Sequence, residues 1–343
     1  MTRGRASERR GSTTSASRRR VLSRAGAGLL GAAGVVGTGT ETSATAGTEP
    51  SVQSSQETAV ADQPLFDAHT HLIPAETLDR EPLHADDLVS WMDAVGIDRA
   101  VVLALDSPES YPVQAPSWWI LEQVAAYPDR LVPFCTVDPR TLVYEEDFSA
   151  VTNLLERYVE RGARGFGELK AGLPVDDARH ERLYELCAEH GLPVVLHLDD
   201  KTMLDAVGLP RFENVLASFP DVDFVGHAHG WWAHISADVE ESDLGRYPER
   251  PVEPGGRVPE LLARYDNVYG DLSGLSGWTG LTRDPEYGQA FLETHHEQLL
   301  FGTDYLHPDQ ETPQLGLFDR FDLSAEAWAN VRYRNLEGLL GEA

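Results

Sequence analysis

Two closely spaced histidines mark the first place in the sequence where a metal ion could bind. Asp67-Ala68-His69-Thr70-His71 follows a short apolar run that begins at Leu65. Side chains of a strand alternate between its faces, so His69 and His71 are expected to point in the same direction. Two neutral imidazoles at one strand end form half of a divalent metal site. The pattern His-x-His is a weak signal by itself, so the interpretation depends on further ligands.

Three later apolar runs also end in groups that bind metals. His197 ends Val-Val-Leu-His, His227 and His229 lie in Val-Gly-His-Ala-His, and Asp304 ends Phe-Gly-Thr-Asp. Each residue alone has an ordinary explanation, either as a hydrogen-bonded core histidine or as a helix cap. Residues 227 and 229 are two apart, so on a continuing strand both would face the same way. Together these residues predict one site assembled from several strand ends.

Glu168 and Lys170, in Gly-Glu-Leu-Lys, add a carboxylate and an amine to the candidate set. A structural salt bridge explains this pair as well as a ligand role does. The remaining histidines of the predicted helices and loops are expected to be solvated: His84, His180, His190, His295 and His296.

The elements that must position these residues recur along the chain. Apolar runs bounded by turn residues begin near Leu65, Arg99, Arg130, Ala163, Leu192, Asp221, Asn267 and Glu297. Segments with helical spacing lie between them, at 85–95, 118–127, 151–158, 180–190, 258–265 and 285–295. Eight strand–helix units predict a (β/α)₈ TIM barrel, whose chemistry lies at the carboxyl ends of the strands. An open doubly wound sheet is the alternative, but no glycine-rich phosphate loop follows the first run.

The longest interval follows the sixth strand and is predicted to form a lid or a substrate wall. It contains Trp231, Trp232 and a proline-containing loop over residues 236–257. These tryptophans, with Trp278, could form an aromatic wall or pack in the core, and Arg246 or Arg283 could hold a substrate carboxylate.

The first 62 residues are not expected to belong to the barrel. Residues 1–46 contain paired arginines before Val21-Leu22, a glycine-rich apolar stretch too short to span a bilayer, and small residues at 44–46. They resemble a twin-arginine export signal, which predicts an exported protein. Residues 47–62 are expected to be a disordered linker and residues 63–343 the barrel domain.

The charge of the chain restricts its partners and its environment. The formal net charge is −28, and residues 1–46 carry eight arginines and two glutamates, so the rest of the chain has a charge of −34. Such a surface argues against nucleic acid as a partner and against insertion of the mature chain in a membrane. It favours a halophilic protein and a small-molecule substrate, and it is compatible with a homo-oligomer. Cys135 and Cys187 lie in apolar patterns and are expected to be buried thiols.

The order of the motifs is more specific than any one of them. They are residues 67–71, Val-Val-Leu-His197, Val-Gly-His227, Asp271-Leu272-Ser273-Gly274, Phe-Gly-Thr-Asp304 and the closing residues 334–341. This set resembles the amidohydrolase superfamily, and most closely the amidohydrolase-related branch that includes aminocarboxymuconate semialdehyde decarboxylase. The resemblance extends from about Leu65 to the carboxyl terminus.

The resemblance implies an enzyme with one divalent ion, zinc, held by His69, His71, His197 and Asp304. His227 would be the catalytic histidine, and Asp304 would also accept a proton from the metal's water. A metal-bound hydroxide would then hydrolyse an amide, an ester or a lactone. The alternative within the same branch is decarboxylation of an unsaturated or aromatic carboxylic acid.

Glu168 and His229 leave two further alternatives open. Gly167-Glu168 looks similar to the strand-four motif of TatD-type deoxyribonucleases, in which Glu168 would bridge two metals and His227 would bind the second. His229 stands where the family is not expected to have histidine, so it could serve a second metal or the substrate. A non-catalytic alternative is an exported metal-binding protein with a closed site.

The excess of negative charge makes stability depend on salt. We expect the melting temperature of the mature protein to rise with salt concentration up to the molar range, because ions screen the repulsion between its carboxylates. Thermal unfolding in a series of sodium chloride concentrations measures this dependence. A melting temperature that does not change at low salt would contradict the halophilic interpretation.

Overall fold

A computed structural model describes residue 60 and residues 62–141 and 147–342. The predicted signal peptide and all of the predicted linker except residues 60 and 62 lie outside the described residues. The eight predicted strands are confirmed, and they form one parallel sheet in the order β1-β2-β3-β4-β6-β8-β9-β10. Their bounds are β1 (Phe66–His71), β2 (Arg99–Leu103), β3 (Leu131–Cys135), β4 (Gly165–Leu169), β6 (Val194–His197), β8 (Phe224–His227), β9 (Val268–Asp271) and β10 (Leu299–Leu300).

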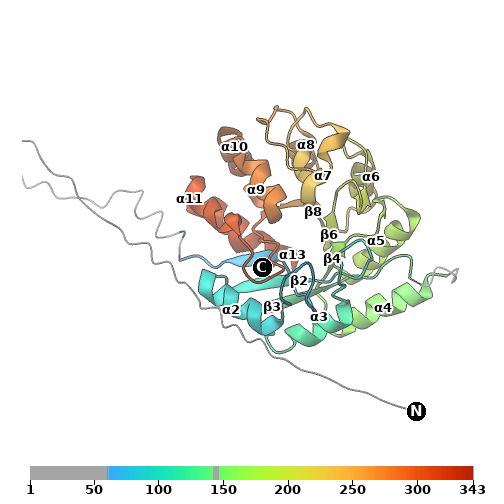
Figure 1. The fold of residues 1–343 in the computed structure, drawn as a ribbon. Helices are drawn as coiled ribbons and strands as arrows, with labels where there is room; N and C mark the ends of the chain where they lie inside the picture. Colours follow the sequence, from blue (N-terminus) through green and yellow to red (C-terminus); the bar gives the residue numbers. More distant parts are fainter. Residues whose placement is uncertain (1–59, 61, 142–146, 343) are drawn as a thin grey trace, which may run out of the picture. The chain divides into compact units, whose positions relative to one another are not determined.

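The sheet curls until its first strand meets the segment that follows its last. The backbone N–H of Ala68 donates to the carbonyl of Phe301 at 2.8 Å, and the N–H of His71 donates to the carbonyl of Tyr305 at 2.9 Å. This gives the predicted TIM barrel, with helices around the strands (Figure 1). A separate short pair joins β5 (Leu173–Pro174) to β7 (Met203–Leu204).

Helices lie between the strands, as the apolar spacing predicts, and three more, α11 to α13, follow β10. They are α2 (Ala85–Val95), α3 (Ser117–Val124), α4 (Ser149–Glu160), α5 (Ala178–His190), α6 (Pro210–Ser218), α7 (Ala228–Ala233), α8 (Arg257–Arg264), α9 (Gly274–Thr282), α10 (Pro285–His295), α11 (Leu317–Arg320), α12 (Ala325–Ala329) and α13 (Asn335–Leu339). Gly96 and Gly191 end α2 and α5 in the left-handed conformation, with φ of 81° and 61°. Glycine adopts this conformation without strain, which lets the chain return to the next strand.

Two apolar layers hold the barrel together. A larger cluster of buried residues packs the helices on the outside of the strands. A smaller cluster fills the inside with residues such as Phe66, Val101 and Phe134, and it includes Leu336 and Leu339 of α13. The carboxyl-terminal helix therefore closes one end of the barrel interior, and the opposite end is left for the candidate site.

The predicted burial of the two cysteines is confirmed, since Cys135 and Cys187 are buried free thiols. Across the described residues, no helix is both long enough and apolar enough to cross a membrane. The expectation that His180 and His295 are solvated is wrong, because both are buried. His180 is fully buried on α5, and its Nδ1 lies 2.8 Å from the carbonyl oxygen of Pro174.

Burial of His180 predicts a loss of stability in acid. Burial lowers the pKa of His180 to about 4, so this residue stays neutral in the folded chain while it protonates near pH 6.5 in the unfolded chain. Its contribution is therefore present above pH 6.5 and is lost as the pH falls toward 4, up to about 3 kcal/mol. Denaturant unfolding at several pH values should show a smaller acid-induced loss for His180→Gln, whose amide can still donate to Pro174. Equal losses in the two proteins would contradict this assignment.

Candidate functional site

Four of the predicted residues bring ligand atoms together at the carboxyl-terminal end of the barrel. The Nε2 atoms of His69 and His71 are 3.1 Å apart. Asp304 Oδ1 lies 3.6 Å from His69 Nε2 and 3.5 Å from His71 Nε2. Glu168 Oε2 lies 3.7 Å and 3.4 Å from the same two nitrogens. Ligands at about 2.1 Å from a tetrahedral ion are roughly 3.4 Å apart, so this donor set fits a divalent ion.

Irregularities in two strands turn these side chains toward the barrel centre. The register of β1 against β2 shifts between Asp67 and Thr70. Phe66 and Ala68 pack inside the barrel, and after the shift His69 and His71 also point inward. The register of β4 against β6 shifts in the same way between Phe166 and Leu169, around Glu168. Such bulges re-aim side chains and are common beside active sites.

Asp304 is positioned by hydrogen bonds to the first strand. It follows β10 with a φ of 58°, a left-handed conformation that aspartate tolerates better than most residues. Its backbone N–H donates to the carbonyl of His69 at 2.8 Å. The buried carboxylate of Asp67 accepts from the Thr303 N–H at 3.0 Å and from the Thr303 hydroxyl at 2.6 Å. The loop that carries Asp304 is thereby tied to β1.

Asp271, at the end of β9, orients two of the imidazoles. Its Oδ2 lies 2.6 Å from His69 Nδ1 and 3.2 Å from His227 Nδ1. A carboxylate at both Nδ1 atoms favours a proton there, so the Nε2 atom of each ring faces the centre and is the one that can bind an ion once it is deprotonated. Ser273 Oγ, 3.0 Å from His227 Nδ1, adds a second contact. The motif Asp-Leu-Ser-Gly at the end of a predicted strand was the available signal, but the sequence assigned no role to Asp271 or Ser273.

Glu168 lies between two groups of histidines. Its Oε2 faces His69 and His71, while its Oε1 lies 2.5 Å from His197 Nδ1 and 3.7 Å from His227 Nε2. Lys170 Nζ lies 2.6 Å from Oε2, so the predicted salt bridge is also present. Burial alone would raise the pKa of Glu168, but the positive charges of Lys170, His197 and His69 hold it well below its usual range. The carboxylate therefore remains ionised at the centre of the site.

His197 is not one of the residues that place a ligand atom beside His69 Nε2 and His71 Nε2. Its other ring nitrogen, Nε2, lies 3.5 Å from Asp199 Oδ2, and these two residues form a further cluster with His229. The expectation that His229 continues the strand beside His227 is wrong. The strand β8 ends at His227, the backbone turns at Ala228 with a φ of 79°, and His229 begins the first turn of α7.

The histidines differ in their tendency to bind a proton. Burial lowers the pKa of His69, but the charges of Asp271 and Glu168 outweigh this effect and hold it well above its usual range. Burial and the charge of His69 lower the pKa of His227. A neutral His227 beside ionised carboxylates can accept a proton during a reaction.

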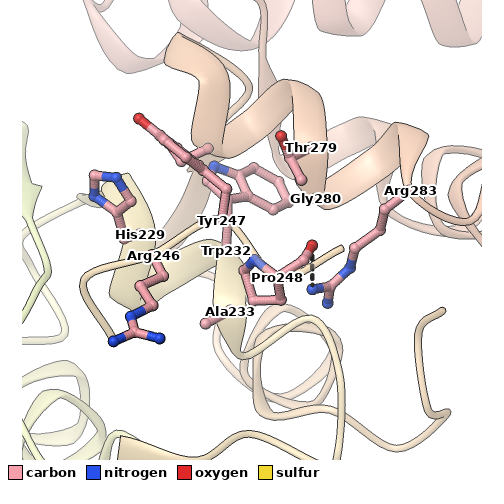
Figure 2. Close-up of a pocket in the computed structure, with 10 residues that line it drawn as sticks. His229, Trp232, Ala233, Arg246, Tyr247, Pro248, Thr279, Gly280 and Arg283 are labelled. Atoms are coloured by element: carbon pink, nitrogen blue, oxygen red, sulfur yellow. Dashed lines mark hydrogen bonds between the residues drawn. The ribbon is translucent and has the colours of Figure 1, made fainter. Parts of the chain in front are cut away.

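A small pocket lies next to the site, between α7, α9 and the loop after the sixth barrel strand (Figure 2). Trp232 lines it, and its indole N–H donates to the carbonyl of Asp271 at 2.8 Å. Trp231 is fully buried in the core instead, and Trp278 packs against the core beneath Arg320. Of the three tryptophans considered for a substrate wall, only Trp232 lines this pocket.

Known structures share this fold at low sequence identity. An uncharacterized TIM-barrel protein from Bordetella bronchiseptica has 19% identity and a TM-score of 0.58, with 81% of this chain and 99% of that chain covered. A probable 2-pyrone-4,6-dicarboxylic acid hydrolase from Acinetobacter baumannii has 14% identity and a TM-score of 0.52, with 81% and 99% covered. A 5-carboxyvanillate decarboxylase from Novosphingobium aromaticivorans, solved with manganese and a nitrobenzoic acid, has 16% identity and a TM-score of 0.53, with 82% and 96% covered.

The family assignment comes from the sequence itself. No protein of curated function matches the chain. The solved structures, at these identities, show the fold alone. The sequence profile of the family described as Amidohydrolase matches residues 66–341, which include every barrel strand and each residue of the candidate site. The chain therefore belongs to the amidohydrolase family.

Proposed function

We propose that this protein is a metal-dependent hydrolase that cleaves a small-molecule amide, ester or lactone at the carboxyl-terminal mouth of its barrel. The observation that carries the proposal is the convergence of His69 Nε2, His71 Nε2 and Asp304 Oδ1, which lie 3.1–3.6 Å apart, with Glu168 Oε2 at 3.4–3.7 Å from the two imidazole nitrogens. Imidazole nitrogens and carboxylate oxygens that converge on one point are the donors that a divalent ion requires.

His69, His71 and Asp304 would hold the ion, with Glu168 Oε2 as the nearest fourth donor and His197 supporting Glu168 from its other oxygen. Imidazole and carboxylate ligands suit zinc, and manganese is the metal named for the decarboxylase structure of similar fold. A bound divalent ion would lower the pKa of a coordinated water to near 7 and polarise a substrate carbonyl.

Asp304 and His227 would carry out the proton transfers. Asp304, whose pKa is lowered to about 2 by a hydrogen bond from His71 and by the charge of His69, stays ionised and can accept a proton from water. His227 presents a lone pair on Nε2, because Asp271 and Ser273 engage its Nδ1. It can accept or return a proton at the substrate.

Decarboxylation is the second candidate. Structures of similar fold include a 5-carboxyvanillate decarboxylase and a dihydroxybenzoic acid decarboxylase, both with manganese. The same donors and the same proton-transferring histidine would serve the protonation of an aromatic or unsaturated ring carbon. Assay of the metal-loaded protein against lactones, esters and amides, and separately against hydroxybenzoic acids, distinguishes the two reactions by their products.

The charges around Glu168 favour one ion over two. Its two oxygens face separate histidine pairs, as a bridging ligand would require. However, the ammonium of Lys170 lies 2.6 Å from Oε2 and neutralises this carboxylate. A carboxylate that is already paired with an ammonium has less negative charge left to share between two divalent ions.

We also propose that the protein is exported by a twin-arginine-type pathway and acts on a small molecule, with neither nucleic acid nor a membrane as its partner. The paired arginines before Val21 and the net charge of −28 support this proposal. Amino-terminal sequencing of protein recovered outside the cell tests the cleavage near residue 46.

Substitution of Asp304 tests the metal site. We expect Asp304→Asn to lose turnover while the fold is kept, because the amide cannot accept a proton and binds a cation weakly. Metal analysis should find one zinc or manganese per wild-type chain, and circular dichroism should match that of the exposed control Asp266→Asn, which should remain active. Full activity without metal would refute the proposal, and two ions per chain would favour the bridging role of Glu168.

His227 and His229 should differ in their kinetic effects. We expect His227→Asn to lower kcat by about 10²–10⁴ with metal retained, because a positioned proton-transferring group is lost. His229→Asn should mainly raise KM, because His229 lies on α7 beside the pocket and outside the group of His69, His71 and Asp304. Steady-state kinetics and metal analysis of both variants measure this difference. The reverse pattern would assign catalysis to His229, and loss of metal from His227→Asn would indicate a binuclear site.

A further inference from the structure

Arg283, directly after α9, is a cation that the residues around it leave largely unsatisfied. Its Nη1 donates to the carbonyl of Pro248 at 3.2 Å. Its Nε and Nη2 are buried and have no hydrogen-bond partner within the described part of the chain. The carboxylates of Asp238 and Asp243 lie in the same region, but Arg250 binds both, at 2.7 Å and 2.6 Å. Arg283 is therefore left with one long hydrogen bond for its whole guanidinium group.

An unsatisfied guanidinium in this position costs stability. Burial, together with the charge of Arg250, lowers the pKa of Arg283, which shows that its surroundings disfavour the charged form. Buried donors without acceptors cost about 1–3 kcal/mol, and more when they are charged. Arginine has a fork of N–H donors that matches a carboxylate. A carboxylate supplied by a ligand would satisfy both free nitrogens.

The pocket that Arg283 lines lies along one face of α9, the helix whose first residue, Gly274, is close to Asp304 and His227. Ser276, Thr279, Gly280 and Arg283 follow the spacing of one helix face and all line the pocket. Seven residues of helix span about 10 Å between Ser276 and Arg283. At the near end, a Cβ placed on Gly274 would lie 3.2 Å from Asp304 Oδ2 and 3.6 Å from Ser276 Oγ.

A second unsatisfied polar atom lies toward the site. His229 lines the same pocket from α7, and its Nδ1 is buried and has no hydrogen-bond partner among the described residues. Figure 2 shows His229 and Arg283 at opposite ends of the lining residues, with Trp232 and Pro248 between them. The pocket therefore offers a polar group at each end and an aromatic surface in the middle, which suits a planar organic acid.

The loop after the sixth barrel strand now fills most of this space. The cavity measures about 10 Å³, room for about one water molecule. The ring of Tyr247 packs on His229 with centroids 4.4 Å apart, and the next residue, Pro248, supplies the carbonyl bound by Arg283. A substrate can enter this space only if the segment of Tyr247 and Pro248 moves outward.

We propose that Arg283 is a specificity-determining residue that binds a carboxylate of the substrate. This inference rests on the proposed function and narrows its substrate to carboxylic acids with a ring or chain between the carboxylate and the reacting bond. The substrate carboxylate accepts from Nε and Nη2 of Arg283, and the ring lies against Trp232. Arg246 also lines the pocket, but its side chain is exposed, where water satisfies it.

Calorimetric titration of the full-length, metal-loaded protein with benzoate and with benzamide tests the proposal. We expect benzoate to bind, and Arg283→Gln to raise its Kd at least tenfold while benzamide binding does not change. Arg283→Lys should recover part of the affinity, because it keeps the charge but loses the fork. Arg246→Gln is the matched control in the same pocket and should bind benzoate like the wild type. Melting temperatures of all variants show that the fold is kept.

Two results would overturn the proposal. Equal benzoate affinity in wild type and Arg283→Gln would show that Arg283 does not bind the carboxylate. A loss of affinity confined to Arg246→Gln would assign carboxylate binding to Arg246 in the loop. Removal of the metal separates this inference from the proposed function. If benzoate binding needs the metal but not Arg283, the carboxylate binds at the ion. The hydrolase proposal is then kept, and the proposed role of Arg283 is refuted. If the protein binds no metal but Arg283 still binds benzoate, the proposed role of Arg283 is kept and the hydrolase proposal is refuted.

Discussion

The buried negative charge of Glu168 is the constraint on which the rest of the site depends. An ionised carboxylate inside a barrel is costly unless cations or donors surround it, and here Lys170, His197 and the pair His69 and His71 do so. Because these groups come from β1, β4 and β6, the charge also fixes how the strand ends face one another. A metal ion would add to an arrangement that is already balanced around this carboxylate.

Asp271 contacts the Nδ1 atoms of His69 and His227, whereas Glu168 lies on the Nε2 side of the same two rings. By contacting the Nδ1 atoms of His69 and His227, it gives both imidazoles the same tautomer and directs both Nε2 lone pairs inward. Its own pKa is lowered, because these histidines outweigh the effect of burial. The site is therefore built from two carboxylates that hold histidines, while Asp304, whose side chain is partly exposed, faces the mouth.

The chain as a whole has a net negative charge, whereas Arg283 gives the pocket a positive charge. A net charge of −28 repels organic anions at low ionic strength, and salt weakens this repulsion over a Debye length of about 8 Å or less. A buried guanidinium is screened far less, so Arg283 can attract a carboxylate that the outer surface does not. The proposed binding of a carboxylate by Arg283 would therefore depend less on salt than the repulsion by the outer surface does.

The sequence alone determined the barrel, because eight apolar runs at regular intervals leave few other ways to bury them. It also identified His69, His71, Glu168, His227 and Asp304, since residues at the carboxyl ends of barrel strands meet at one mouth. Only the tertiary structure decided how they meet. The shifts of register in β1 and β4 break the two-residue alternation on which a prediction of facing depends, and the turn at Ala228 removes His229 from the strand. The role of Asp271 and the unsatisfied nitrogens of Arg283 depend on contacts between distant segments, which no local pattern records.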